Sequence, residues 1–115
     1  MNKDTSPVFI GGLMKSGTSL LRKLISLHPN IFGGLETHWF SREFKENWNN
    51  PDHSRLIWLK EMYDLDHSEM KQLIKLSKNH IEFFDNFMAK NISKVNKKRW
   101  VEKTPGNVFN ISSIF

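Results

Sequence analysis

The sequence contains no cysteine and no long apolar run. The absence of cysteine excludes disulfides and thiolate metal sites, and it allows a reducing compartment. No stretch approaches the roughly 20 apolar residues that a membrane-spanning helix needs. Residues 1–7 also lack the apolar segment of a secretory signal peptide. We therefore expect a soluble cytoplasmic protein with no membrane partner.

Repeats, low-complexity tracts and linkers between domains are also missing. Residues 1–115 therefore predict a single small domain. Seventeen basic and twelve acidic residues give a formal net charge of +5. That excess suits nucleic acid, a membrane surface or a polyanionic ligand. The basic residues gather only at Lys94, Lys97, Lys98 and Arg99. We interpret this cluster as a solvated surface and expect no nucleic-acid partner.

One stretch combines three features of a phosphate site. Residues 7–12 form a short apolar run that predicts a strand, and residues 18–28 have a helical apolar pattern. Between them lie glycines, a lysine and hydroxyl side chains. Amides at the first turn of a helix point outward, and the helix dipole favours an anion there. The sequence therefore predicts that residues 7–12 form a central parallel strand and that residues 13–18 wrap an anion.

The loop differs from the ordinary nucleoside-triphosphate loop. That motif has its lysine directly after the last glycine. Here Gly12 and Gly17 have the right spacing, but Thr18 follows Gly17 and Lys15 precedes it by two positions. The displaced charge suits a ligand whose reactive group lies elsewhere on the phosphate.

Three motifs together resemble the sulfotransferases that use 3′-phosphoadenosine 5′-phosphosulfate (PAPS). Residues 12–21, GLMKSGTSLL, look like the loop that binds the 5′-phosphosulfate. Residues 28–37, HPNIFGGLET, look like the segment after the first helix in the tyrosylprotein and carbohydrate branches. Residues 101–105, VEKTP, look like an element of the glycosaminoglycan branch. The resemblance implies an α/β fold of the P-loop type, a parallel sheet flanked by helices, of which this chain is an incomplete, N-terminal part.

The chemistry of sulfuryl transfer assigns roles to these residues. The loop, residues 11–19, suits the donor phosphate, with Lys15 meeting the charge that develops on it. Its donor-binding residues are Lys15, Ser16, Gly17, Thr18 and Ser19. The resemblance places the general base on Glu36 and gives Lys103 a supporting catalytic role. The expected acceptor carries a hydroxyl group and is a sugar, a tyrosine or a small alcohol. No metal is expected.

Each assignment has a plainer alternative. Glu36 and Lys103 also fit ordinary surface residues. His38 is a rival base, because small-molecule sulfotransferases use histidine. Trp39 and Phe40 fit the hydrophobic core better than an acceptor pocket. Arg22 is interpreted as facing solvent rather than the ligand.

The remaining pattern predicts mostly helices. Ser54 is expected to cap a helix, and Asp66 or Ser68 to start the longest helix, which continues to Ile92 on one apolar stripe. Residues 100–103 predict the next strand. A further helix is expected from Asn107.

Three functions remain open. The first is a PAPS-dependent sulfotransferase or its N-terminal part. The second is a nucleotide-binding kinase, and the third is a non-catalytic remnant that binds phosphate or a partner through a sheet edge. The family holds the donor's 3′-phosphate with a later arginine and serine, and no such segment occurs here. Many eukaryotic sulfotransferases that act on tyrosine or carbohydrate are Golgi membrane proteins. The expected cytoplasmic location would set this chain apart from them.

Overall fold

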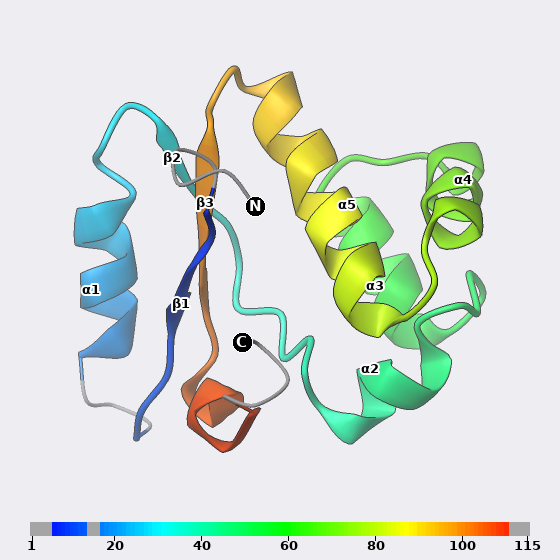
Figure 1. Cartoon of the computed structure of the whole chain (residues 1–115), viewed down its shortest axis with the longest axis horizontal. Helices are drawn as coiled ribbons and strands as arrows, with labels where there is room; N and C mark the ends of the chain where they lie inside the picture. Colours follow the sequence, from blue (N-terminus) through cyan, green and yellow to red (C-terminus); the bar gives the residue numbers. More distant parts are fainter. Residues whose placement is uncertain (1–5, 14–16, 111–115) are drawn as a thin grey trace.

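The computed structural model describes residues 6–13 and 17–110. Three short strands and a helix lie on one side of the molecule, and a group of four helices lies on the other (Figure 1). In chain order the elements are β1 (Val8–Ile10), α1 (Thr18–Ile25), β2 (Ile31–Gly33), α2 (Arg42–Asn47), α3 (Ser54–Met62), α4 (His67–Leu76), α5 (His80–Lys94), β3 (Arg99–Lys103) and the 3₁₀ helix η2 (Pro105–Asn110).

The three strands form one parallel sheet in the order β1-β3-β2, which confirms the predicted α/β fold. Val8 pairs with Val101, and Ile31 pairs with Arg99. Within the described residues β3 is therefore the central strand and β1 lies at an edge, so the prediction of a central β1 is wrong. An apolar run shows that a strand is buried but does not show which strands pair with it.

The two faces of the sheet are covered by different layers. Successive side chains of a strand point to opposite faces. On one face lies α1: a Cβ atom on Gly33 would overlap Ser26, the residue at the C-terminal end of that helix. On the other face Trp100 contacts Phe9 and Phe84 of α5, with 5.2 Å between ring centroids in each pair. The aromatic core lies on this second side, between the sheet and α5.

The predicted longest helix is two helices, α4 and α5, and this prediction is wrong in one respect. The backbone is extended at Ser77 and Asn79, and the Oδ1 atom of Asn79 accepts a hydrogen bond of 2.8 Å from the Glu82 amide. Side chains such as Asn and Ser offer the backbone these local bonds in place of helical ones. The apolar stripe continues across the break because both helices face the same core.

Other boundaries shift by a few residues. Helix α1 ends at Ile25 rather than at residue 28, and His53 rather than Ser54 caps α3 by accepting a bond from the Arg55 amide. The expected helix from Asn107 is part of η2, and its continuation over residues 111–115 lies outside the described residues.

We expect Asn79→Ala to lower the free energy of unfolding by about 1 kcal/mol. The reason is that an amide of α5 loses its capping oxygen, for which losses of about 0.5–2 kcal/mol are typical. Chemical denaturation of the variant measures the loss, with the exposed neighbour Lys78→Ala as the control. Equal stability of the two variants would contradict the capping role.

Candidate functional site

The candidate site lies at the edge of the sheet where the parallel strands end. Ligands of open parallel sheets bind outside this edge. Lys103 is the last residue of β3, and Glu36 follows the end of β2 by three positions. β1 also ends at this edge, and α1 begins there (Figure 1). The fold thus brings together three segments that are far apart in the sequence.

Glu36 and Lys103 form an ion pair at this edge. The Nζ atom of Lys103 lies 3.3 Å from Oε2 of Glu36. The Lys103 side chain is only 8% exposed, whereas that of Glu36 is 37% exposed. Lys103 is therefore not an ordinary surface lysine, and Glu36 keeps a carboxylate that solvent and a ligand can reach.

His38 contacts the same carboxylate from the other side. Its Nε2 atom lies 3.4 Å from Oε1 of Glu36, and half of its side chain is exposed. Its backbone has φ = 54°, in the left-handed region that residues with a Cβ atom rarely adopt. The rival base of the sequence analysis is thus a direct neighbour of Glu36, and both side chains are partly exposed.

The phosphate loop is described only in part. Gly17 has φ = 91° and precedes α1, whose first helical bond runs from the Leu21 amide to the Gly17 carbonyl. The amides of residues 18–20 come before that bond, and the first turn contains no acidic residue. Thr18 is buried and Ser19 is exposed. Lys15 and Ser16 lie outside the described residues, so the predicted anion loop over residues 13–18 stays a prediction.

Two side chains fix the backbone on the N-terminal side of Glu36. Arg22 of α1 donates from Nη1 to the Gly34 carbonyl at 3.0 Å, and the Leu35 amide donates to the Tyr63 hydroxyl at 2.9 Å. A Cβ atom on Gly34 would overlap that hydroxyl. Burial raises the pKa of Tyr63 to about 12, so it stays a neutral phenol at physiological pH. Arg22 therefore holds the loop and does not simply face solvent, which corrects the sequence interpretation.

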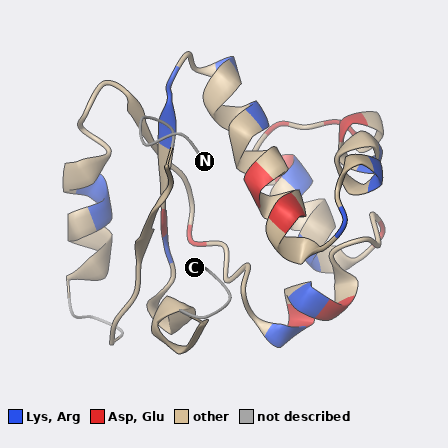
Figure 2. Ribbon diagram, viewed as in Figure 1, with Lys and Arg blue, Asp and Glu red and all other residues tan. Residues whose placement is uncertain are grey.

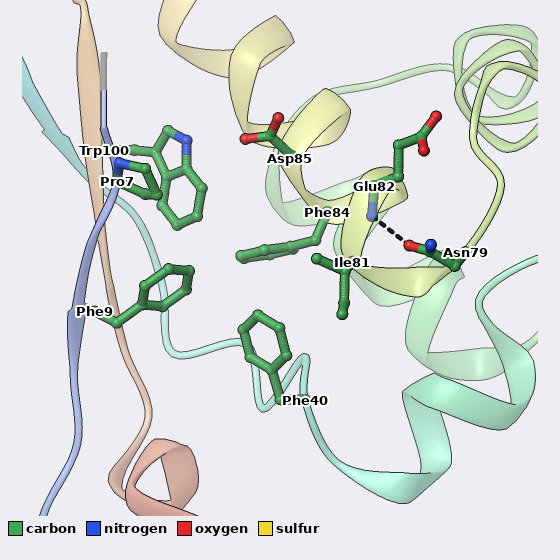
Figure 3. A pocket seen from close by; sticks show the side chains of 9 residues that line it. All are labelled: Pro7, Phe9, Phe40, Asn79, Ile81, Glu82, Phe84, Asp85 and Trp100. Carbon is green, nitrogen blue, oxygen red and sulfur yellow. Dashed lines mark hydrogen bonds between the residues drawn. The ribbon is translucent and has the colours of Figure 1, made fainter. Parts of the chain in front are cut away.

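Trp39 and Phe40 belong to the core, as the sequence favoured. Trp39 is fully buried and Phe40 is 7% exposed. A pocket of about 310 Å³ lies beside Phe40, on the α5 side of the sheet (Figure 3). Lys103 alternates with Trp100 and Glu102 along β3 and shares the α1 face with Val101. This pocket therefore lies on the opposite face of the sheet from Lys103.

The sequence analysis missed Glu102, Thr104, Thr37 and Asn107. All four are buried next to the site, with exposures of 1%, 4%, 1% and 4%. A signal for Glu102 exists in the strand pattern, because period-two alternation places it on the same face as the buried Trp100. Within the described part of the chain, no three His, Asp or Glu side chains gather as metal ligands.

Curated relatives match part of the chain. Over 57 residues it is 35% identical to Protein-tyrosine sulfotransferase 1 of Danio rerio. The match covers 48% of this chain and 16% of the relative. The human enzyme of the same name gives the same identity over 15% of its length. Protein-tyrosine sulfotransferase of Drosophila melanogaster is 35% identical over 49 residues, 41% of this chain and 10% of the relative. The matched segments thus span about a sixth or less of these relatives. No solved structure matches significantly.

These relatives overturn the expectation of a cytoplasmic protein. That expectation set the chain apart from the Golgi membrane enzymes of the tyrosylprotein branch, yet the relatives found are protein-tyrosine sulfotransferases. The cytoplasmic assignment is therefore wrong. Among the helices of the described residues, none is long and apolar enough to span a bilayer.

The family itself is shown by a match over nearly the whole chain. The sequence profile described as the Sulfotransferase family covers residues 7–115, a range that includes the glycine loop, Glu36 and Lys103. The names of the relatives fit the tyrosylprotein branch. The chain belongs to the Sulfotransferase family.

Proposed function

We propose that this chain carries the 5′-phosphosulfate loop and the general base of a site that transfers a sulfuryl group from PAPS to an acceptor hydroxyl. The observation that supports the proposal best is the meeting of Glu36 and Lys103, 3.3 Å apart, at the sheet edge where α1 begins. A base and a buried cation beside a helix N-terminus are the groups that this reaction needs. We further propose that residues 1–115 form one N-terminal part of a sulfotransferase domain.

Glu36 acts as the general base in this proposal. Sulfuryl transfer forms a bond between the acceptor oxygen and sulfur and breaks the bond between sulfur and a phosphate oxygen. The acceptor hydroxyl must lose its proton as the new bond forms. The Glu36 carboxylate, which is 37% exposed, takes that proton. His38 is the second candidate, because it lies 3.4 Å from Glu36 and half of it is exposed.

Positive groups meet the negative charge of the donor. Basic residues lie on α1 and at both ends of β3 (Figure 2). Lys103 is the one at the edge of the site, because Arg22 and Lys23 are in the last turn of α1 and Arg99 begins β3. Lys103 supports the sulfonate or the acceptor from the α1 face of the sheet. In the proposal, Lys15, Ser16, Gly17, Thr18 and Ser19 hold the 5′-phosphate, and Lys15 meets the charge that develops on it. The absence of acidic residues from the first turn of α1 supports this fit, because a carboxylate there would repel the donor.

The acceptor carries a hydroxyl group. The names of the relatives favour a tyrosine, while a sugar or a small alcohol satisfies the same chemistry. A kinase function is disfavoured because Lys15 does not follow the last glycine of the loop, as the triphosphate motif requires.

We expect the 115-residue chain to bind 3′-phosphoadenosine 5′-phosphate, the desulfonated product, more tightly than magnesium ATP. The displaced lysine suits a single 5′-phosphate better than a triphosphate chain. Isothermal titration calorimetry measures both affinities, and binding of the product is expected to be weak because no arginine and serine for the 3′-phosphate were recognised in this sequence. Tighter binding of magnesium ATP would overturn the assignment of the donor.

A pair of lysine variants locates the binding to the loop. Lys15→Ala is expected to weaken product binding by about 10–100-fold, because hydrogen bonds to charged groups contribute about 1.5–3 kcal/mol. Lys23→Ala, an exposed residue further along α1, is the control and should bind normally. Equal losses in the two variants would point to general charge attraction instead of a loop site.

A further inference from the structure

Glu102 is a carboxylate buried in the middle of the sheet. It lies on central strand β3, directly before Lys103, and is 1% exposed. An ionised group in such a place costs several kcal/mol unless hydrogen bonds replace its water. A side chain that served only to fill this space would not need to be charged. We therefore expect hydrogen-bond donors of the protein around the Glu102 carboxylate.

Four donors converge on the two oxygens of Glu102. Oε1 accepts from the Thr37 amide at 3.1 Å, from the Thr37 hydroxyl at 2.9 Å and from the Thr104 hydroxyl. Oε2 accepts from Nδ2 of Asn107 at 2.7 Å. Every contact donates to Glu102, which suits a group that only accepts. The carboxylate is therefore fully used within the protein and is not itself available to substrate.

The hydroxyls that bind Glu102 are fixed by second bonds. Thr104 Oγ1 accepts from the His38 amide at 3.0 Å, and Thr37 Oγ1 accepts from the Trp39 amide at 3.2 Å. Asn107 also donates to the Ile10 carbonyl at 3.0 Å, at the end of β1. Glu102 thus ties together three segments of the site: residues 36–38, the end of β3 and the end of β1.

These bonds explain how the loop keeps an unfavourable shape. His38 has φ = 54°, which costs about 1–3 kcal/mol for a residue with a Cβ atom and persists only where the surroundings hold it. The Thr104 hydroxyl that binds the His38 amide is itself bound to Glu102. On either side of Thr37, the side chains of Glu36 and His38 then approach each other to 3.4 Å.

We propose that Glu102 is a positioning residue: through Thr37 and Thr104 it sets the place of Glu36 and His38 relative to Lys103. The catalytic importance of this positioning rests on the proposed sulfuryl transfer, whereas the positioning itself does not depend on it. The alternative is that the backbone of the loop alone holds its shape. In that case Glu36, His38 and Lys103 would stay together without Glu102.

The first test reads the positions of the site residues by nuclear magnetic resonance. In Glu102→Gln, which keeps the shape but replaces one oxygen by a donor, we expect the side-chain signals of Glu36, His38 and Lys103 to shift and broaden while the protein stays folded. Asn91→Ala is the matched control, because Asn91 is buried and donates to the Phe87 carbonyl away from the site. Unchanged signals in Glu102→Gln, or equal changes in the control, would overturn the proposal.

A second pair of variants leaves Glu102 in place. Thr37→Val removes one donor to the carboxylate, and Thr37→Ser keeps it. We expect the same spectral changes with valine and recovery with serine, and a fall of about 10–100-fold in kcat for sulfuryl transfer with valine, without a change in KM for the donor. Misplacement of reacting groups by about 1 Å is enough for such a loss. Normal spectra with valine would contradict the positioning role.

The two proposals fail in different ways. Absence of sulfuryl transfer and of product binding in the unchanged protein would count against the proposed function. The spectra of the Glu102 and Thr37 variants would still decide whether Glu102 positions the loop, because they need no turnover.

Discussion

We expect Glu36→Gln to lower the turnover number for sulfuryl transfer by about 10²–10⁴-fold, the range that general base catalysis typically contributes. The amide keeps the size of the carboxylate and its hydrogen bonding but cannot take the proton of the acceptor hydroxyl. The measurement is the steady-state rate with PAPS and a tyrosine-containing acceptor, using the longest form of the protein that turns over.

Product binding separates this effect from damage to the donor site. Glu36 lies after β2, on the segment proposed to serve the acceptor, so Glu36→Gln should bind 3′-phosphoadenosine 5′-phosphate as the unchanged protein does. Glu61→Gln, an exposed carboxylate on α3, is the matched control and should keep normal turnover. Near-normal turnover in Glu36→Gln would move the base elsewhere, with His38 as the first candidate because it lies within 3.4 Å of Glu36.

The sequence analysis gave Glu36 and Lys103 separate roles and did not predict their ion pair, but it could have predicted that both lie at one edge of the sheet. Both residues follow or end apolar runs that read as strands, and parallel strands present their carboxyl ends at one edge. That rule places the two residues, 67 positions apart, at the same edge of the sheet. Their contact also requires that β2 and β3 be neighbours, and the sequence did not predict the order of the strands.

The parts that the sequence did not predict depend on one local hydrogen bond and on contacts between distant segments. The break between α4 and α5 follows from Asn79, whose local bond wins over an apolar stripe that continues on both sides. The left-handed backbone of His38 is stabilised by Thr104, 66 positions away. Glu102 is bound by Thr104 and Asn107, which follow it closely, and by Thr37, 65 positions away, and no local pattern indicates the contact with Thr37.

The core beside the site gives the largest expected change in stability. Trp39 directly follows His38 and is fully buried. Its ring stacks on Phe83 and Phe84, with centroids 5.1 and 5.2 Å away, and lies 4.3 Å from that of Phe44. Its Nε1 atom donates to the His80 carbonyl at 2.7 Å. Trp39 therefore joins the site loop to α2 and α5.

We expect Trp39→Ala to lower the free energy of unfolding by about 3–5 kcal/mol, the usual loss when a buried tryptophan or phenylalanine is cut back to alanine. The total free energy of unfolding of a small domain is about 5–15 kcal/mol, so this variant would retain only a small margin of stability. Denaturation in urea measures the loss, and Phe109→Ala is the control, because Phe109 is 88% exposed and should change little. Trp39→Phe keeps a ring in the stack but loses the bond to His80, so its loss should be smaller. If the free energy of unfolding falls by less than about 1 kcal/mol in Trp39→Ala, the helices hold together without this residue. The loop that carries Glu36 and His38 would then depend for its position on Glu102 far more than on the aromatic core.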